Sequence, residues 1–371
     1  MFDHITTSTI AAVDVDAAAF RRALATLGHV IERRNSIPVL ATARAIVKPG
    51  QITLTATDLD LELSMTIPAA TGDSMTFLLP PKAIADALAK AKGTASFVTD
   101  GASISLECQG GKLETGNPDT PDNFPHMAPL LWQSRAQVPA HDLALALRAV
   151  AHCISTEATR YYLGGVYLHG HKPAGDAPAH LRLVSTDGHR LALYDLPMPW
   201  EADGAILPMK AVLLLQRLLK DAGTAEIDIA YPADGRAGLF FTGPGWTLNC
   251  KVIDGSFPDY TRVFPAYSDA FTIILPAADF PKITGKARVA LAFDTAEGVM
   301  RWRGDDNGAE MSRPVLAEGE AIIGFAAQYL AGFLAADPGA SITVQGASPG
   351  DPARITTADP RFLGVLMPMR V

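Results

Sequence analysis

The sequence contains few cysteines, few charged residues and no long apolar run. Its 371 residues include 3 cysteines, Cys108, Cys153 and Cys250, and 19% charged residues. These cysteines are too far apart for a CxxC motif or a disulfide framework, so a reducing cytoplasm is the expected compartment. No apolar run reaches the roughly 18 residues that span a bilayer. The first 12 residues lack a basic segment followed by an apolar one, which argues against secretion.

Motifs for catalysis and metal binding are also missing. There is no glycine–lysine loop for nucleotide phosphates, and no cysteine has a recognisable catalytic partner. Asp187 and His189 suggest a hydrolase or a metal site, but both lie in one predicted hairpin without a second ligand cluster. Asp58, Asp60 and Glu62 alternate, which predicts a solvated strand face. We therefore expect no catalysis, no cofactor and no metal, and an enzyme acting at Asp187 and His189 is the weakest hypothesis.

The overall balance of residues is that of an ordinary globular protein. Hydrophobic residues make up 48% of the chain, and the formal net charge is −8. This length predicts two or three domains with ample core, because domains usually contain about 100–200 residues. The acidic total argues against a simple basic nucleic-acid binder, although it does not say how charge is distributed.

One unit recurs along the chain: a strand ends in an apolar residue, often followed by proline, and an alanine- and leucine-rich helix begins. Proline suits the first helical turn because its missing N–H would have no partner there. The copies are Val15–Arg34, Leu79–Lys92, Val138–Val150, Leu207–Lys220, Leu275–Lys286 and Phe325–Ala336. Alternating strands follow each copy, so pairs of copies predict three α+β domains with helices on one side of antiparallel sheets. The expected domains are 1–128, 129–254 and 255–371, with boundaries in the stretches 117–129 and 254–265.

The strand signals are regular. Residues 52–65 alternate apolar and polar side chains with a period of two, which is typical of a half-buried strand. The tetrapeptide Thr186-Asp-Gly-His joins two further alternating runs. Because Asp-Gly favours tight turns, this segment predicts a hairpin.

Positive charge is concentrated in the predicted helices. Windows 17–34, 81–92, 139–150, 208–220, 276–288 and 325–336 hold 14 Lys and Arg against 4 Asp and Glu, a net charge of +10 that leaves −18 for the remainder. In the fourth window Lys210, Arg217 and Lys220 share one face. If the helices share a surface, it suits phosphates contacted without regard to base sequence. The alternative is that these cations only decorate solvated helix faces, and the sixth window carries no charge.

Six segments carry a family resemblance. They are Glu32–Leu40, Leu54–Glu62, Thr159–Val166, Val184–Ala192, Phe257–Pro265 and Val365–Val371. In order and spacing they resemble the bacterial DNA polymerase III β subunit, the sliding clamp. The resemblance implies three similar domains of the DNA clamp fold, and two chains closed head to tail into a ring with the helices lining the hole. It implies a non-catalytic processivity factor for DNA replication, which holds polymerases on DNA by enclosure.

The resemblance also implies partners. They are double-stranded DNA of any sequence, a second copy of the chain, the DNA polymerase III catalytic subunit, an ATP-driven clamp loader and other proteins with a clamp-binding peptide motif; no membrane is expected. The peptides would bind in a groove between the second and third domains. The matching residues are Leu163, Thr186, Gly188, His189, Arg190, Leu191, Pro258, Arg262, Val263, Val365, Leu366, Met367, Pro368, Met369, Arg370 and Val371.

This residue set is chemically suited to a peptide. Its leucine and valine side chains supply an apolar floor, and its methionines supply a surface that adapts to different peptides. Its arginines suit polar groups and a terminal carboxylate. The alternative for the Met367-Pro-Met tail is a final buried strand.

The DNA contacts are expected from the helices and from family matches. The matches point to Arg34, Tyr161 and Tyr162, because a planar side chain stacks on bases of single-stranded template. The alternative for the tyrosines is packing within a hairpin. The full expected set is Arg22, Arg34, Lys82, Lys90, Arg148, Tyr161, Tyr162, Lys210, Arg217 and Lys220.

Two departures from the family fall on the expected subunit interface. The third domain should open with a helix longer than two turns, but Pro281 and Gly285 interrupt the short segment before the strand at 288–293. The first domain's edge, 112–122, is polar and contains Pro118 and Pro121, which cannot donate to a strand ladder. The second hypothesis is therefore a clamp-like adaptor that keeps the peptide groove but closes the ring weakly or not at all.

Overall fold

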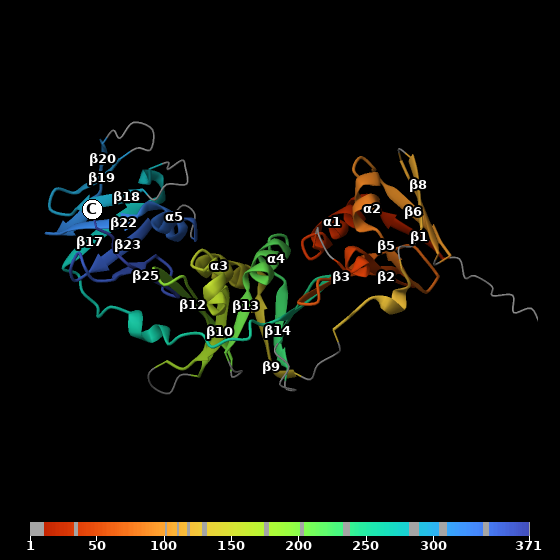
Figure 1. Ribbon diagram of the computed structural model, residues 1–371, viewed down its shortest axis with the longest axis horizontal. Coiled ribbons are helices and arrows are strands. Elements are labelled where there is room, and N and C mark those ends of the chain that lie inside the picture. Colours follow the sequence, from red (N-terminus) through yellow and green to blue (C-terminus); the bar gives the residue numbers. More distant parts are fainter. Residues whose placement is uncertain are drawn as a thin grey trace, which may run out of the picture. The chain divides into compact units, whose positions relative to one another are not determined.

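The protein is described by a computed structural model. It describes residues 11–32, 36–100, 102–109, 111–116, 119–127, 132–173, 178–200, 204–232, 238–281, 289–303, 310–336 and 341–370. The chain divides into two compact units, the first formed by Met1–Gln133 with Ile227–Lys251 and the second by Ser134–Glu226 with Val252–Val371. Each unit combines helices with antiparallel sheets, as the sequence predicted (Figure 1). The boundaries proposed for three domains stay a prediction.

The first unit places two helices against its sheets. One sheet has the order β1-β6-β7-β8, and in the other β5-β2-β3-β4-β16-β15-β14 lie side by side. The elements are β1 (Ala11–Asp16), α1 (Ala17–Leu27), η1 (Pro38–Ala41), β2 (Ala43–Lys48), β3 (Gln51–Thr57), β4 (Leu61–Pro68), β5 (Met75–Leu79), α2 (Pro81–Ala87), β6 (Thr94–Thr99), β7 (Ser103–Cys108), β8 (Gly111–Gly116), η2 (Pro121–Asn123), β14 (Glu226–Pro232), β15 (Gly238–Gly243) and β16 (Trp246–Lys251). Helices α1 and α2 contact each other, and α1 covers β3 and β4.

Over its described residues, the second unit contains three α-helices and most of the predicted functional residues. One sheet has the order β13-β10-β11-β12-β25-β24-β23-β17-β21, and the other has the order β20-β19-β18-β22. The elements are β9 (Trp132–Pro139), α3 (Ala140–Ala151), η3 (Ala158–Leu163), β10 (Gly165–His171), β11 (His180–Thr186), β12 (Arg190–Pro199), β13 (Ala205–Pro208), α4 (Met209–Leu219), η4 (Tyr260–Val263), β17 (Phe271–Pro276), η5 (Ala277–Asp279), β18 (Ala290–Asp294), β19 (Val299–Arg303), β20 (Glu310–Pro314), β21 (Leu316–Gly319), β22 (Ile322–Ala326), α5 (Ala327–Ala336), β23 (Ser341–Gly346), β24 (Ala353–Thr356) and β25 (Phe362–Leu366). Helix α3 packs against α4, α5 and the strands β10, β11 and β12.

The predicted helices form in five of the six repeats, but the first is shorter than expected. Helix α1 starts where Asp16 accepts the N–H of Ala19 at 2.7 Å, a typical N-cap, and buries Phe20 and Leu24 at helical spacing. It ends at Leu27 with Gly28 as its cap, so the helical part is shorter than the repeat Val15–Arg34. The stretch 33–35 lies outside the described residues.

The fifth repeat forms only a single turn of 3₁₀ helix within the part that the structure describes. This turn, η5, follows β17 directly and ends at Asp279. Pro281 then removes the N–H that a continuing helix would need. The remainder of the repeat, 282–288, including Gly285, lies outside the described residues. The expected interruption before Pro281 is confirmed.

The prediction of a solvated acidic face at residues 58–62 is correct for Asp60, whose side chain is exposed, but it is wrong for Glu62. Two strands with a turn, β3 and β4, replace one continuous run, and the Asp58 carboxylate accepts the N–H groups of Asp60 and Leu61 at 3.0 and 2.6 Å inside that turn. Glu62 is only 7% exposed. Its carboxylate accepts the Met127 N–H at 2.9 Å and the Asn249 side-chain amide at 3.2 Å, so it joins β4 to β16 and to the stretch after η2.

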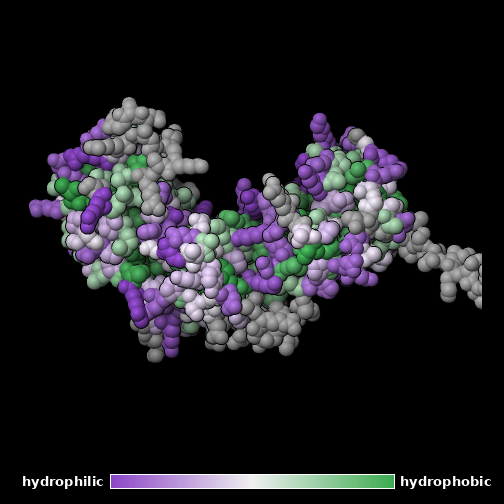
Figure 2. Space-filling view, in the orientation of Figure 1, coloured by the Kyte–Doolittle hydropathy of each residue, from purple (hydrophilic) through white to green (hydrophobic). Residues whose placement is uncertain are grey.

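The hairpin predicted at Asp187-Gly188 is confirmed. It joins β11 to β12, and Gly188 has a φ of +87°, a conformation that favours glycine. A Cβ atom there would lie 2.6 Å from the end of the Arg160 side chain, which is flexible and can move aside, so the positive φ is the feature that favours glycine. On the face shown in Figure 2, hydrophobic patches are small and interrupted by hydrophilic side chains in both units. Among the described residues, no helix has the length and apolar composition of a membrane span.

Candidate peptide-binding site and basic helix surface

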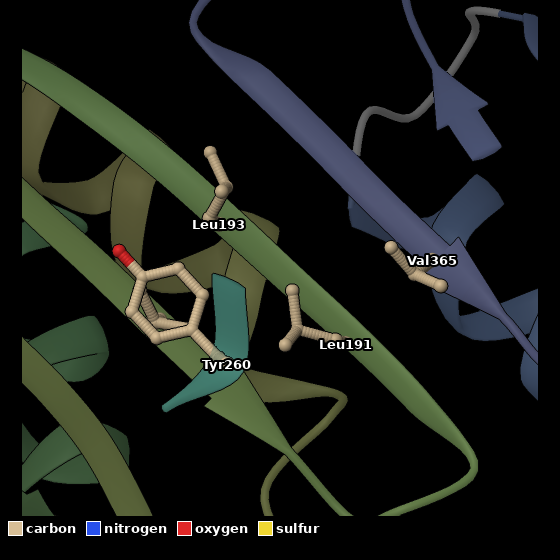
Figure 3. Close-up of a cluster of buried hydrophobic side chains, with 5 residues drawn as sticks. Leu191, Leu193, Tyr260 and Val365 are labelled. Atoms are coloured by element: carbon tan, nitrogen blue, oxygen red, sulfur yellow. The ribbon is translucent and has the colours of Figure 1, made fainter. Parts of the chain in front are cut away.

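Four chain segments meet at one apolar cluster: the strands β11, β12 and β25, and the segment that contains Tyr260. Leu191 and Val365 are register partners in the neighbouring strands, and both side chains are buried. Together with Val184, Leu193 and Tyr260 they form one apolar cluster, with Tyr260 supplied by the segment that precedes β17 (Figure 3). The structure therefore brings together Leu191 and Val365, which lie far apart in the sequence and which the family resemblance had grouped. The other three members of the cluster were not in the predicted set. We call this cluster the apolar floor.

Residues 254–265, which we call the connector, supply one side of the apolar floor. The connector contains η4, whose N-cap Asp259 accepts the Thr261 N–H at 3.2 Å and the Arg262 Nε–H at 2.9 Å. The Arg262 side chain is 83% exposed, and Val263 is also exposed. Because Tyr260 is buried while its neighbours face solvent, the connector presents a charged and an apolar side chain beside the floor.

The tail after β25 supplies a second side. The Met367 N–H donates to the His189 carbonyl and the Met369 N–H donates to the Gly324 carbonyl, both at 2.9 Å. Met367 and Arg370 are exposed, while Pro368 and Met369 are half-buried. Thus β25 is the final buried strand, and the tail leaves it as a partly exposed segment. Val371 lies outside the described residues.

Leu366 differs from the other tail residues predicted for peptide contact. It is fully buried, and strand alternation turns it away from the face that carries Val365. We therefore assign Leu366 to the packing of β25 and leave it out of the apolar floor.

Arg190 lies at the other end of the apolar floor. Its Nε donates to Asp187 Oδ2 at 3.0 Å, and its guanidinium carbon lies 4.5 Å from the centre of the Tyr329 ring, a cation–π distance. The His189 ring also stacks on the Tyr329 ring, with centroids 6.1 Å apart and an angle of 18° between the two planes. Burial and the nearby Arg190 charge lower the pKa of His152 to about 3, so that ring is neutral near Arg190. These contacts hold the Arg190 guanidinium at one edge of the apolar floor, in position to donate hydrogen bonds.

Tyr329 was missed by the sequence analysis. The available signal was one aromatic side chain with a polar tip at the start of α5, a helix without charged residues. Helical position alone did not show that this ring faces the β11–β12 turn. Asp187 in turn accepts the N–H groups of His189 and Arg190 at 2.9 and 3.0 Å, which makes it a turn-forming residue in this geometry.

Helix η3 borders the same turn. Arg160 donates to the Asp187 carbonyl at 3.2 Å, and Leu163 is buried at the end of η3. Thr186 accepts the Gly188 N–H at 3.1 Å and donates to the Arg190 carbonyl at 2.8 Å, so it shapes the turn. Tyr161 is 57% exposed and meets Tyr162 edge to face at 5.8 Å. An exposed ring of this kind is free to stack, whereas the hairpin-packing alternative would bury it.

Two of the predicted cations, Arg148 on α3 and Lys220 at the end of α4, line one cavity. This cavity of about 470 Å³ is lined by Arg148, Lys220, His141 and Gln216 among smaller side chains. Arg217 and Lys220 are exposed and Lys210 is half-buried. Arg148 also donates its Nε–H to the Ala336 carbonyl at the end of α5, at 2.9 Å, so part of its guanidinium is committed to the fold.

In the first unit, the predicted cations Arg22, Lys82 and Lys90 are all exposed on or beside α1 and α2. Arg21, which was not predicted, donates to the Ala89 carbonyl at 2.8 Å and so links α1 to the segment after α2. Arg34 lies outside the described residues. Within the part of the chain that the structure describes, no group of three or more His, Cys, Asp or Glu is placed to hold a metal ion.

A polar clasp joins α3 and β12 to the turn before β25. Tyr194 donates its hydroxyl to Asp359 at 2.7 Å, and Arg361 donates to Asp142 at 3.0 Å. Arg361 also donates to Asp359 and lies 5.1 Å from the centre of the Tyr194 ring. Because β12 and β25 both carry the apolar floor, the clasp helps to fix their relative position.

The clasp should make the unfolding free energy fall in acid. The hydrogen bonds from Arg361, followed by that from Tyr194, lower the pKa of Asp359 from 3.8 to about 2. A lowered carboxyl pKa adds stability above its unfolded value and loses it as the pH falls, here between about pH 5 and pH 2. Asp359→Asn should therefore weaken the pH dependence of the unfolding free energy in that window, as measured by urea unfolding. An unchanged slope would contradict the assignment, and Asp351→Asn, in an exposed turn, is the control.

Comparisons with known proteins place this architecture in a family. Two family profiles match, the DNA polymerase III beta subunit N-terminal domain over residues 12–112 and its central domain over residues 137–259. The beta sliding clamp of Caulobacter vibrioides is 31% identical over 386 aligned residues, covering 96% of this chain and 99% of the relative. That of Rickettsia bellii is 27% identical and covers 71% of this chain.

Solved structures agree. A DnaN sliding clamp from Bartonella birtlesii bound to griselimycin has a TM-score of 0.86 and 28% identity, covering 98% of this chain and 100% of that chain. A Caulobacter crescentus beta sliding clamp has a TM-score of 0.86 and 29% identity over the same share. The fold is thus that of the DNA sliding clamps.

The chain belongs to the DNA polymerase III beta subunit family. It is a sliding clamp, a non-catalytic processivity factor of DNA replication. The likeness extends over 96% of the chain, so it does not favour the hypothesis of an adaptor that has lost the clamp role.

Proposed function

We propose that two copies of this chain close head to tail into a ring around duplex DNA. We further propose that the ring tethers the DNA polymerase III catalytic subunit, and other proteins with a similar linear peptide, at the apolar floor. A clamp loader driven by ATP would open and place the ring, because the sequence has no nucleotide-binding loop of its own. The cytoplasm is the proposed compartment.

The meeting of β11, β12, β25 and the connector at one cluster, with the tail continuing from β25 beside it, carries the tethering proposal. A linear peptide needs an apolar surface for its side chains and polar groups that fix its direction. Leu191 and Val365 belong to the floor, Val263 and Met367 are exposed at its sides, and Arg190 is held by Tyr329 and Asp187 at one edge. Leu163, Pro258, Arg262 and Arg370 complete the proposed contact surface.

The exposed cations support the DNA-binding proposal. Arg22, Lys82 and Lys90 in the first unit, and Arg217 and Lys220 in the second, sit on or beside helices and face solvent. Cations that contact phosphates bind without sequence preference and exchange readily, which permits sliding. Tyr161 and Tyr162 are proposed to contact bases of single-stranded template.

Open sheet edges support the dimer. Strand β8 is the edge of one four-stranded sheet and β20 the edge of another, and strand edges offer unpaired backbone groups to a second chain. Lys112 on β8 pairs with Glu114 at 2.7 Å and lies 3.8 Å from Glu107, so this edge is charged. A charged edge favours a ring that opens more readily than one closed by an apolar edge.

Sedimentation tests the ring directly. At micromolar concentration we expect the mass of a dimer, and raising the salt concentration should promote dissociation because the β8 edge is charged. A monomer at every concentration would contradict ring closure and favour the adaptor hypothesis. Polymerase binding by that monomer would show that tethering had survived without enclosure.

A further inference from the structure

The connector is fastened to strand β10 by two aromatic contacts. The Phe257 ring stacks on Tyr167 with centroids 4.8 Å apart and planes within 5°, and Tyr167 stacks in turn on His169 at 4.8 Å. The Tyr260 hydroxyl lies 2.9 Å from His169 Nε2. Phe257 and Tyr260 therefore contact two side chains of β10 that are two residues apart and so lie on the same face of the strand.

The hydrogen bonds fix the tautomer of His169. Its Nδ1 lies 2.9 Å from the Gly170 carbonyl oxygen, which can only accept, so Nδ1 carries the proton. In the neutral ring Nε2 is then an acceptor, and the Tyr260 hydroxyl donates to it. Burial raises the pKa of the Tyr260 hydroxyl, and the nearby Arg182 guanidinium opposes that rise.

The groups around this pair are mostly cationic or titratable. From β11 and β12, Arg182 donates to Asp195 at 2.6 and 2.8 Å, and His180 Nε2 lies 3.1 Å from the same carboxylate. His171, on β10, meets His169 at 6.4 Å between ring centroids, and Asp259 is the charged neighbour on the connector. The Asp195 carboxylate is already paired with Arg182, and its attraction for a cation at His169 is smaller than the opposing effect of the Arg182 charge.

We propose that Tyr167 and His169 are positioning residues that latch the connector onto the sheet, and that protonation of His169 loosens this latch. The latch holds Pro258, Arg262 and Val263 in place beside the apolar floor, so the inference rests on the proposed peptide-binding function. When Nε2 gains a proton, it ceases to accept from Tyr260. The existing hydrogen bond is then lost, and the Tyr260 hydroxyl could keep the contact only by turning to accept from a cationic ring beside the Arg182 guanidinium.

The direction of the pH effect follows from burial. Burial, followed in effect by the nearby Arg182 charge, lowers the pKa of His169 below its ordinary value of 6.5. A histidine whose pKa is lowered on folding adds stability above 6.5 and loses it as the pH falls below that value. The latch is therefore intact at neutral pH and weakens in mildly acidic solution.

Hydrogen exchange of the connector amides in the free full-length protein tests the latch itself. Tyr260→Phe removes only the hydroxyl, and we expect exchange at residues 259–264 to rise about five-fold at pH 7.5, the effect of about one net hydrogen bond. In the unaltered chain, the exchange rate of the connector amides relative to unstructured peptides should rise as the pH is lowered from 7.5 to 5.5. His169→Gln keeps a hydrogen-bonding side chain that does not titrate, so its relative exchange should be the same at both pH values.

The matched control is Tyr194→Phe. It also removes one tyrosine hydroxyl bond, to Asp359, but this tyrosine donates to the turn before β25 and takes no part in the latch. Its connector exchange should match that of the unaltered chain. Unchanged exchange in Tyr260→Phe, or a pH response in His169→Gln equal to that of the unaltered chain, would overturn the latch.

Binding of the purified DNA polymerase III catalytic subunit then tests positioning. Tyr260→Phe should weaken binding about five-fold, and the weakening between pH 7.5 and pH 5.5 should be smaller in His169→Gln than in the unaltered chain, with His189 left in place. Unchanged affinity in Tyr260→Phe despite faster connector exchange would overturn the positioning role. If the unaltered chain does not bind the polymerase at all while exchange responds as expected, the latch stands and the proposed function fails.

Discussion

Truncation of the chain after Leu366 is expected to weaken binding of the DNA polymerase III catalytic subunit at least about 100-fold, which corresponds to about 2.7 kcal/mol. The truncation removes the exposed Met367 side chain, the half-buried Met369 and the exposed Arg370, one whole side of the proposed peptide site. A few central contacts usually carry most of the energy of an interface. Surface plasmon resonance with immobilised polymerase measures the change.

The fold should survive this truncation. The tail forms two backbone hydrogen bonds beyond β25, to His189 and Gly324, whereas the buried strand itself remains. Circular dichroism should therefore show unchanged secondary structure. Met367→Asp in the full-length chain gives a second variant without loss of the backbone contacts, and it should also bind weakly. Leu316→Ser removes an exposed apolar side chain from β21 and is the control. Unaffected binding by the truncated chain would refute the site assignment.

The second large effect concerns DNA. Replacing Arg217 and Lys220 with glutamine is expected to reduce the salt dependence of binding to short linear duplex DNA by about 1.8 in the logarithmic slope, since each phosphate contact contributes about 0.9. Both side chains are exposed at the end of α4. Replacing them with glutamate should weaken binding further, because repulsion adds to the lost attraction. Fluorescence anisotropy across a salt series measures the slope.

A control with equal loss of charge separates position from net charge. Lys48 ends β2 and Lys172 follows β10, and both are exposed on strand segments. Replacing these two with glutamine should leave the slope unchanged if the helices form the DNA-facing surface. A slope reduced equally by both pairs would show that binding follows total charge, and the proposed helix surface would be wrong.

The regular elements could be predicted from the sequence because their signals are local. The alternation in 52–65 predicted strands, and Asp187-Gly188 predicted the hairpin between β11 and β12. The apolar spacing of Phe20 and Leu24 predicted α1, but not its end at Leu27. Helix ends depend on capping by individual residues and are less strongly encoded than the apolar stripe.

The site could be predicted only in part, because its contacts join distant segments. Leu191 and Val365 were grouped by resemblance to a family, and the structure shows them as register partners. Tyr329 was missed because its partner Arg190 lies far away in the sequence. Glu62 was misjudged for the same reason: its hydrogen-bond partners Met127 and Asn249 make a buried carboxylate stable, and neither is near it in the sequence.

Retention on circular DNA tests the sliding-clamp ring most directly. The protein is placed on a nicked circular plasmid by a clamp loader with ATP and then separated by gel filtration in high salt, which suppresses phosphate contacts. We expect the protein to stay with the closed circle and to be lost when a restriction enzyme linearises the plasmid. Equal retention on circular and linear DNA, or loss from both in high salt, would contradict enclosure.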